Sequence, residues 1–323
     1  MKKLLKIGIA LVSIILFTVI AGILYVSYAL PNVGPPPQDL KVTATAEKIA
    51  RGKYLAYHVL QCIDCHSQRD FSIFSGPPRM GTEAQGGERF DQTMGFPGIF
   101  ISPNITPAGI GDWTDGELYR LITTGVRKNG DPIFPVMPFE SYGKLDPDDI
   151  EAVIAYIRTL QPTATNHPES APDFPFNLIM RTLPKKAMPE KKPLPEDQVA
   201  YGKYLVTASA CNDCHTKSEN GTVTGELLAG GREFLLPGGV LTSSNITPHE
   251  TGIGAWNREM FINRFKSYQN HEDLPRVGPM DFQTIMPWYM YSGMTEDDLS
   301  AIYAYLRSIN PVDNKVIPFK PNS

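Results

Sequence analysis

The sequence predicts an all-α protein in which two tandem copies of one helical domain follow an N-terminal apolar helix. Three observations support this fold class: an uncharged apolar segment at the start, an internal repeat, and helical spacing of apolar residues in both copies. Neither copy contains a convincing alternating strand. The residues that recur at i, i+3, i+4 and i+7 are Ile150, Val153, Ile154 and Ile157 in the first copy and Leu299, Ile302, Tyr303 and Leu306 in the second.

The composition of the 323-residue chain excludes several classes of protein. Hydrophobic residues make up 42% and charged residues 20% of it, which is typical of globular folding and not of general disorder. A net charge of -4 provides no basic surface for nucleic acid. Four cysteines are too few for a disulfide-stabilised miniature scaffold of this length. We therefore expect two domains of ordinary size.

Residues 1–30 are predicted to form a single-pass membrane anchor. Three lysines among the first six residues precede an uncharged segment, residues 7–30, which as a helix is about 36 Å long and can cross a hydrocarbon core. The lysines keep the N-terminus in the cytoplasm, so the rest of the chain lies on the outer, periplasmic face of the cytoplasmic membrane. A cleaved signal peptide is the alternative, because Ser27-Tyr28-Ala29 matches a cleavage pattern, but the apolar segment is longer than such peptides use. A stiff proline-rich linker, residues 31–44, follows.

The remainder of the chain contains the same short motifs twice. The first cysteines of the two copies, and likewise their Met-Pro pairs, are 149 residues apart, which indicates a tandem duplication. We expect domain 1 at residues 45–164, an extended but packed proline-rich linker at residues 165–197, and domain 2 at residues 198–316. The repeated motifs are Gly52-Lys53-Tyr54-Leu55 and Gly202-Lys203-Tyr204-Leu205, Cys62-Ile63-Asp64-Cys65-His66 and Cys211-Asn212-Asp213-Cys214-His215, Asn104-Ile105-Thr106-Pro107 and Asn245-Ile246-Thr247-Pro248, Met137-Pro138 and Met286-Pro287, and Ala155-Tyr156-Ile157-Arg158 and Ala304-Tyr305-Leu306-Arg307.

Capping signals locate the helices within each copy. Asp146-Pro147 in the first copy and Thr295 in the second predict the N-termini of the closing helices. Thr114 and Glu117 predict a capping box at a middle helix. An opening helix is expected near residues 46–59, ending just before the first cysteine.

Other repeated residues have structural roles in this interpretation. Gly52 and Gly202 are expected to let the opening and closing helices cross closely, against a tyrosine of the closing helix. Asn104 and Asn245 are expected to form turns. The histidines without a repeat partner are expected at the surface or at helix caps: His58, His167, His249 and His271.

All four cysteines lie in two Cys-x-x-Cys-His motifs, for which three kinds of site compete. A thioredoxin-like redox pair would need alternating strands and helices, which the sequence does not predict. A zinc site built from both pairs would join the two copies and leave two histidines without a role. Covalent haem attachment uses two thiols at this spacing with an adjacent imidazole, and it accounts for every residue twice. The motifs therefore favour two covalently attached haem c groups, one at Cys62 and Cys65 and one at Cys211 and Cys214.

Each haem iron also needs axial ligands, and the repeat supplies them. His66 and His215 follow the cysteines and are the expected proximal ligands. Met137 and Met286 each lie 71 residues after that histidine and precede a proline, so their recurrence favours iron ligation over core filling. The methionines without a partner are expected to pack, the last two being reserve ligands: Met80, Met94, Met260, Met280, Met290 and Met294.

Together these motifs resemble class I c-type cytochromes, and more narrowly the multihaem cytochrome c subunits of bacterial membrane-bound alcohol, aldehyde and sugar-acid dehydrogenases. The resemblance covers most of residues 45–311 and implies class I cytochrome c domains. Those subunits usually have three haem domains and reach the membrane through their carboxyl end, whereas this chain has two copies and an apolar start. By position, the resemblance implies the thioether-forming residues Cys62, Cys65, Cys211 and Cys214 and the ligand pairs His66 with Met137 and His215 with Met286.

The predicted function is electron transfer, and no catalytic residue is predicted. A membrane-anchored dihaem cytochrome c would relay single electrons on the outer face of the membrane. Its expected partners are a dehydrogenase or quinol-oxidising complex on one side and a terminal oxidase or soluble cytochrome on the other. Two alternatives stay open. One is a dihaem enzyme of the peroxidase or thiosulfate-oxidising type, which needs an open iron position, and the other is a structural assembly subunit.

Overall fold

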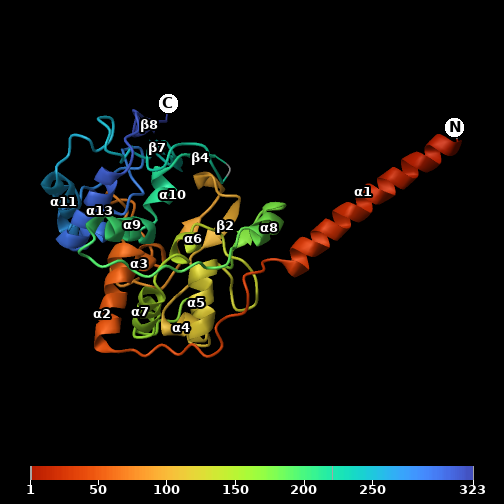
Figure 1. The fold of residues 1–323 in the computed structure, drawn as a ribbon, viewed down its shortest axis with the longest axis horizontal. Helices are drawn as coiled ribbons and strands as arrows, with labels where there is room; N and C mark the ends of the chain where they lie inside the picture. Colours follow the sequence, from red (N-terminus) through yellow and green to blue (C-terminus); the bar gives the residue numbers. More distant parts are fainter. Residues whose placement is uncertain (1, 220, 323) are drawn as a thin grey trace.

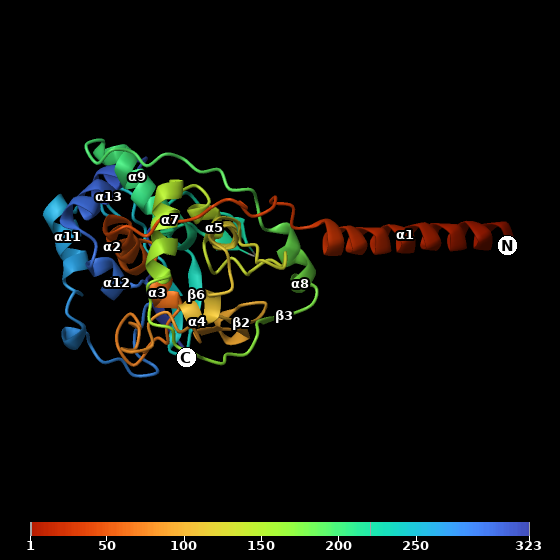
Figure 2. The same cartoon turned by 90° about the horizontal axis from the view of Figure 1, so that it is seen from below.

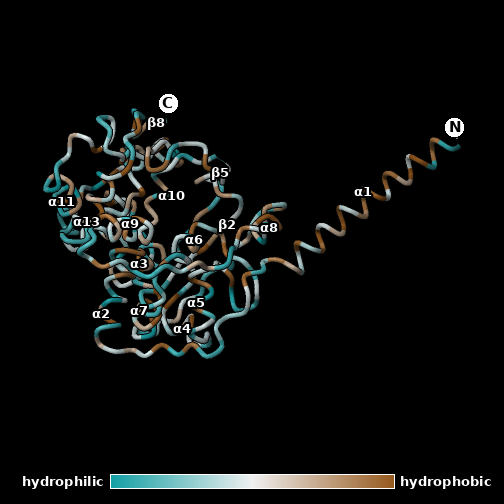
Figure 3. The backbone as a smooth tube through the Cα atoms, in the orientation of Figure 1, coloured by the Kyte–Doolittle hydropathy of each residue, from teal (hydrophilic) through white to brown (hydrophobic). Residues whose placement is uncertain are grey.

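The computed structural model describes residues 2–219 and 221–322. Helix α1 (Lys2–Ala29) projects as a single rod from the body formed by the rest of the chain (Figures 1 and 2). None of its residues is buried, and among the described residues it is the one helix long and apolar enough to cross a membrane. Figure 3 shows hydrophobic residues along its length. The prediction of an N-terminal apolar helix is confirmed.

Residues 45–164, called the first half below, form helices that begin where the capping signals predict. Thr114 and Glu117 form the predicted capping box, and Asp146 caps the closing helix with Pro147 in its first turn. The helices of this half are α2 (Ala46–Tyr54), η1 (Leu55–Val59), α3 (Cys62–Cys65), η2 (Gln92–Met94), α4 (Pro107–Ile110), α5 (Asp115–Thr124), α6 (Phe139–Tyr142) and α7 (Pro147–Ile157).

Residues 198–316, called the second half, repeat the main helices in the same order. The predicted N-cap Thr295 accepts the amide of Asp298 at the start of the closing helix. The helices of this half are α9 (Gln198–Ala208), α10 (Cys211–His215), α11 (Arg258–Lys266), η4 (His271–Asp273), α12 (Trp288–Ser292) and α13 (Glu296–Ser308).

The opening and closing helices of each half touch backbone to backbone at a glycine. A Cβ atom on Gly52 of α2 would lie 1.8 Å from the carbonyl oxygen of Ala152 in α7. A Cβ atom on Gly202 of α9 would lie 1.9 Å from the carbonyl oxygen of Ala301 in α13. No side chain fits at such distances, so only glycine permits these two crossings. The predicted close crossing is confirmed in both halves.

Short antiparallel strands occur between and after the helices, so the predicted all-α fold class is not confirmed. They pair in three small sheets, with orders β1-β2-β3, β4-β5 and β6-β7-β8. An alternating pattern is not visible in strands of two to four residues, which is why the sequence did not reveal them. The strands are β1 (Arg89–Phe90), β2 (Gly98–Ile101), β3 (Ala171–Pro172), β4 (Ser218–Glu219), β5 (Thr222–Val223), β6 (Glu233–Leu236), β7 (Gly239–Thr242) and β8 (Phe319–Pro321).

The two halves pack against each other through reciprocal helix contacts. The end of the first opening helix, η1, contacts α12 of the second half, and the second opening helix, α9, contacts α6 of the first half. One hydrophobic cluster includes buried residues of both halves. His58, expected at the surface or at a cap, is instead partly buried in this contact, where its Nδ1 lies 2.8 Å from the carbonyl oxygen of Met290.

Two tyrosines make equivalent hydrogen bonds across the contact, and we call Tyr54 and Tyr204 the tyrosine clasp. The Tyr54 hydroxyl donates to the carboxylate of Asp298 at 2.5 Å, and the Tyr204 hydroxyl donates to the carboxylate of Asp149 at 2.8 Å. Each hydroxyl also accepts the backbone amide of the N-cap residue of the closing helix that it contacts. The tyrosine at the equivalent position of each half therefore binds the first turn of the closing helix of the other half.

Residues 165–197 connect the halves and pack along the first half, as predicted. This segment contains β3, α8 (Phe176–Ile179) and η3 (Met180–Thr182) before it becomes extended. The amides of Met188 and Glu190 donate to carbonyls of the loop between α6 and α7 at 2.9 and 3.0 Å. Phe174, 78% exposed, does not take part in the packing.

Candidate functional site

Each cysteine motif lies on a short helix that begins at a residue in the left-handed conformation. Gln61, with φ 58°, precedes α3 and its two cysteines, and Ala210, with φ 50°, precedes α10 and its two. Non-glycine residues seldom adopt this conformation, so surrounding contacts must hold both turns. The three-residue spacing places the two thiols of a pair on the same face of their helix.

The two candidate proximal histidines make the same hydrogen bond. Nδ1 of His66 lies 2.8 Å from the carbonyl oxygen of Pro103, and Nδ1 of His215 lies 2.8 Å from that of Ser244. Because a carbonyl only accepts, Nδ1 carries the proton and Nε2 keeps its lone pair. Burial lowers the pKa of both imidazoles and so keeps them neutral. Metal-ligating histidines are commonly oriented in this way, by a hydrogen bond from the other ring nitrogen.

The carbonyls that orient the imidazoles are held by the repeated Asn-Ile-Thr-Pro turns. Oδ1 of Asn104 accepts the amide and the hydroxyl of Thr106 at 2.8 and 2.7 Å. Oδ1 of Asn245 accepts the same two groups of Thr247 at 2.9 and 2.8 Å. Each turn begins directly after the residue whose carbonyl receives the histidine. The predicted turn-forming role of both asparagines is confirmed, and the turns fix the orientation of the imidazoles.

The four cysteines form no disulfide, and burial raises the pKa of their thiols. Burial raises the pKa of Cys62, Cys65 and Cys211 to about 12, and that of Cys214 to about 11. A redox-active pair needs a thiol with a lowered pKa, which these environments disfavour. In the part of the chain that the structure describes, no three His, Cys, Asp or Glu side chains gather as a metal site. These findings weaken the thioredoxin-like and zinc alternatives.

Met137 and Met286 lie in equivalent loops, directly before α6 and α12. Both side chains are half-buried and pack against the same hydrophobic cluster as the first cysteine of each motif. The two methionines held in reserve, Met290 and Met294, are only 2% and 1% exposed and fill the core. Three methionines that were expected to pack are exposed instead: Met80, Met260 and Met280.

Two buried tyrosines that the sequence analysis missed tie the methionine loops to the cysteine helices. The Tyr142 hydroxyl donates to the carbonyl of Leu60 at 2.5 Å, and the Tyr291 hydroxyl donates to that of Ser209 at 2.7 Å. Both accepting carbonyls directly precede the left-handed residue that starts the cysteine helix. Burial raises the pKa of both phenols well above their usual value, so they remain donors. Their shared position, five residues after each Met-Pro methionine, is the signal that could have identified them.

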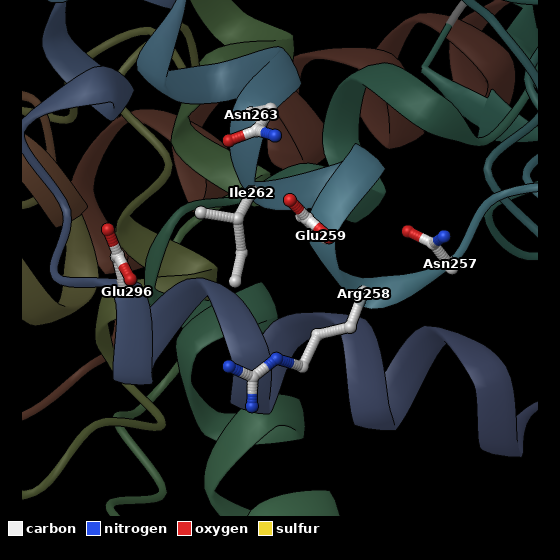
Figure 4. Close-up of a pocket in the computed structure, with 6 residues that line it drawn as sticks. All are labelled: Asn257, Arg258, Glu259, Ile262, Asn263 and Glu296. Carbon is white, nitrogen blue, oxygen red and sulfur yellow. The ribbon is translucent and has the colours of Figure 1, made fainter.

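A shallow hollow at the N-terminal ends of α11 and α13 contains none of the predicted site residues. Its lining side chains are mainly polar or charged and include no thiol or imidazole, so it does not compete with the cysteine motifs. Figure 4 shows the lining residues Asn257, Arg258, Glu259, Ile262, Asn263 and Glu296.

The donors of both halves fit haem c. In each half, two protonated thiols share one helix face, and the adjacent imidazole has its Nδ1 occupied and its Nε2 available. A thioether lies in the loop that a tyrosine ties to the same helix. Uncharged nitrogen and sulfur donors suit a haem iron and not a hard cation, which prefers oxygen ligands.

Comparison with known proteins agrees with this chemistry. A family model described as cytochrome c matches residues 199–310. The chain is 30% identical over 290 residues to the fructose dehydrogenase cytochrome subunit of Gluconobacter japonicus, covering 85% of this chain and 55% of that protein. It is 28% identical over 283 residues to the cytochrome c subunit of alcohol dehydrogenase (quinone) of Gluconobacter oxydans, covering 82% and 55%. It is 29% identical over 266 residues to a protein of Cereibacter sphaeroides named diheme cytochrome c-type, covering 78% and 83%.

The chain spans a little over half the length of these two dehydrogenase subunits and most of the length of the protein named diheme. The family model covers the second cysteine motif together with His215 and Met286. Members of this family carry covalently bound haem c. Residues 199–310 therefore match the cytochrome c family, and the chain is similar over most of its length to proteins named as cytochrome c subunits.

Proposed function

We propose that the chain is a dihaem cytochrome c that relays single electrons. Residues 45–164 and 198–316 would each form a cytochrome c domain, with residues 31–44 and 165–197 as linkers. When bound, haem c supplies the one-electron couple. Two cysteines would hold each haem, with a histidine and a methionine as axial ligands: Cys62, Cys65, His66 and Met137 for one, and Cys211, Cys214, His215 and Met286 for the other.

One observation carries this proposal: the same oriented imidazole recurs after both thiol pairs. A single histidine bound to a carbonyl is compatible with a purely structural role. Here two histidines are bound in this way. Each follows a cysteine helix that starts at a left-handed residue, and each donates to the carbonyl of the residue directly before an Asn-Ile-Thr-Pro turn. This recurrence favours two equivalent ligand sites. The relative named diheme also favours two groups over one.

The ligand set favours electron transfer over catalysis. A thioether opposite an imidazole raises the reduction potential relative to two imidazoles. With both axial positions occupied by side chains, a substrate would have no iron position to enter.

Helix α1 would anchor the protein in the cytoplasmic membrane as a single span, with the haem domains on the outer, periplasmic face. Its apolar side chains are exposed along its length, and its lysines lie on one flank. At the other end, Nε of Arg181 donates to the carbonyls of Val26 and Leu30 at 3.2 and 2.9 Å, which satisfies acceptors that a helix C-terminus leaves free. Arg181 also pairs with Asp131 of the first half at 2.9 Å, so one side chain joins the anchor to the body.

The proposed electron donor is a dehydrogenase, because relatives of this chain are named as cytochrome subunits of alcohol and fructose dehydrogenases. A quinol-oxidising complex is the other donor that a membrane-bound relay would serve. A terminal oxidase or a soluble cytochrome would be the acceptor. A tether raises the effective concentration of the relay near such partners in the same membrane.

Haem attachment is tested by extracting the denatured holoprotein with acid acetone and counting the haem that stays on the polypeptide. We expect two haems per chain, and peptide mass mapping should place one on the peptide of each cysteine motif. Cys65→Ser and Cys214→Ser are matched variants, each expected to attach its own haem poorly and to leave the other in place. Colour that leaves the wild-type polypeptide would overturn the proposal.

Topology and partners need separate measurements. A phosphatase fused after Ser323 should be active only if the body is exported, and the chain should resist alkaline carbonate extraction if α1 is retained. Mass measurement of the mature N-terminus distinguishes an anchor from a cleaved signal peptide.

A dehydrogenase that co-purifies and reduces the haems within a second would support the dehydrogenase partner, whereas reduction by quinol-oxidising membranes alone would support a general relay.

A further inference from the structure

A loop of the first half, residues 68–79, reaches across to the segment that precedes Met286 in the second half. The amide of Phe74 donates to the carbonyl of Pro275 at 2.8 Å, and the amide of Val277 donates to the carbonyl of Ser72 at 2.9 Å. These bonds form a short antiparallel bridge between the halves. The loop thus contacts the second half by backbone pairing as well as by side chains.

The buried side-chain amide of Gln283 strengthens this connection. Its Nε2 donates to the carbonyls of Phe71 and Ile73 at 3.0 and 2.9 Å. Its Oε1 accepts the amides of Ser75 and Thr284, both at 2.8 Å. One glutamine of the second half therefore holds three backbone groups of the first-half loop.

Ser75 makes direct contact with the methionine loop. It is 1% exposed, and its hydroxyl donates to the carbonyl oxygen of Met286 at 2.5 Å. The same hydroxyl oxygen accepts the amide of Trp288 at 3.0 Å. The Trp288 amide also donates to the Met286 carbonyl at 2.8 Å, as the Phe139 amide does to Met137, so the Ser75 hydroxyl bridges both ends of a turn that the backbone closes in each half.

Arg69 holds Ser75 in place and links it to the first cysteine motif. Ser75 has φ 71°, and Nη2 of Arg69 donates to its carbonyl at 2.9 Å while Nε donates to that of Gly76 at 2.8 Å. The guanidinium also lies 3.5 Å from the carboxylate of Asp64, and the two side chains are only 6% and 4% exposed. Asp64 lies between the two cysteines of the first motif. A chain of buried contacts thus connects that motif to the Met286 loop.

The first half has no counterpart of this arrangement. Among the described residues, the carbonyl of Met137 accepts the amide of Phe139 at 2.8 Å and no side-chain hydroxyl. The two methionine loops are equivalent in sequence but differ in what holds them.

We propose that Arg69, Ser75 and Gln283, named here the Ser75 clamp, position Met286 as the ligand of the second haem. This inference rests on the proposed function. The clamp resists opening of the Met286 loop, and a competing ligand reaches the iron only after such opening. Met286 is therefore displaced more slowly than Met137, and the clamp makes the second site depend on the first half.

The test measures displacement of methionine by added imidazole in the oxidised, full-length holoprotein, followed by loss of the methionine-to-iron absorption band. A Met137→His background leaves only the band of the second site. In that background, Ser75→Ala should accelerate displacement about five- to tenfold, the factor for one net hydrogen bond of about 1 to 1.4 kcal/mol, and Gln283→Ala, which removes four hydrogen bonds, should accelerate it at least as much. Ser75→Gly tolerates the positive φ and should act like Ser75→Ala, which separates hydroxyl loss from backbone strain.

Ser72→Ala is the matched control, because this exposed serine lies in the same loop and its hydroxyl contacts Asp70 at 2.6 Å and Arg276 at 3.4 Å but no residue of the Met286-Pro287 turn. It should leave the rate unchanged, and a Met286→His background should show that Ser75→Ala does not affect Met137. If Met286→Ala leaves the band of the second site intact, the proposed ligation has failed and the clamp fails with it. If Met286→Ala abolishes the band but neither clamp variant changes the rate, the ligation stands and the clamp is refuted.

Discussion

Replacing Tyr54 by phenylalanine removes one hydroxyl from the contact between the halves and leaves the aromatic ring in place. The Asp298 carboxylate loses its 2.5 Å donor and keeps the Tyr201 hydroxyl at 3.0 Å. Burial raises the pKa of Tyr201 to about 12, so that this remaining donor stays protonated. No salt bridge neutralises Asp298 among the residues that the structure describes. In the variant, the buried carboxylate of Asp298 therefore accepts one side-chain hydrogen bond fewer.

Two effects set the expected magnitude. A hydrogen bond to a charged group contributes about 1.5 to 3 kcal/mol, so Tyr54→Phe should lower the free energy of unfolding by about 2 kcal/mol. Tyr204→Phe is the matched comparison, because its acceptor Asp149 also pairs with Arg51 at 2.8 Å and Lys192 at 3.0 Å. Asp149 keeps these cations when the tyrosine hydroxyl is lost, so the expected cost is nearer to about 1 kcal/mol.

Urea unfolding of the full-length holoprotein measures both variants, with circular dichroism reporting helices and the haem absorption reporting the sites. A cycle with Asp298→Asn isolates the pair: Tyr54→Phe should cost at least about 1 kcal/mol less in that background than in the wild type. The reasoning is refuted if Tyr54→Phe costs less than about 0.5 kcal/mol, or if it costs the same in both backgrounds.

Three further predictions follow from the helices and ligands. Gly202→Ala places a Cβ against the backbone of Ala301, so α9 and α13 must separate. Urea unfolding should show a free energy of unfolding lower by about 1 to 3 kcal/mol. An unchanged unfolding midpoint would contradict the close crossing. Met137→His should lower the potential of the first haem and leave the second nearly unchanged in a redox titration; if neither moves, Met137 only fills the core. Burial alone would raise the pKa of Asp149, but its hydrogen bond and ion pair with Arg51 lower it overall. The stability that the Asp149 carboxylate contributes is therefore complete above its unfolded-state pKa of about 3.9 and is lost as the pH falls through its lower folded-state pKa. The free energy of unfolding should fall less steeply at acid pH in Asp149→Asn, and an equally steep fall would contradict this assignment.

The repeat is what made much of the candidate site predictable from sequence. Recurrence separated Met137 and Met286 from the other methionines, and the structure places these two in equivalent loops; their ligation of iron stays a prediction. It also marked Asn104 and Asn245, whose turns hold the carbonyls that orient the imidazoles. The same signal was present for the two tyrosines that bind the start of the cysteine helices. Features shared by both halves appear as repeated motifs, which can be detected in a single sequence.

Features present in only one half, or created by contact between distant loops, could not be predicted in this way. Ser75 lies outside the repeated motifs that the sequence reveals, and its hydroxyl meets the Met286 loop only because the fold brings together residues more than 200 positions apart. His58 is similar, because it is partly buried by contact with the second half, where its Nδ1 bonds to the carbonyl of Met290. The short strands depend on pairing between loops, whereas the helix starts at Thr114 and Asp146 were predictable because caps are local.

The tyrosine clasp makes the contact between the halves self-complementary, as in a twofold-symmetric dimer of identical subunits. In such a dimer any substitution appears on both sides, so the two centres cannot acquire different properties. Fusing the partners into one polypeptide removes that restriction while keeping the mutual contact. A serine in one copy can then hold one methionine loop alone, so two copies that contact each other symmetrically can still differ in the loops that hold their methionines.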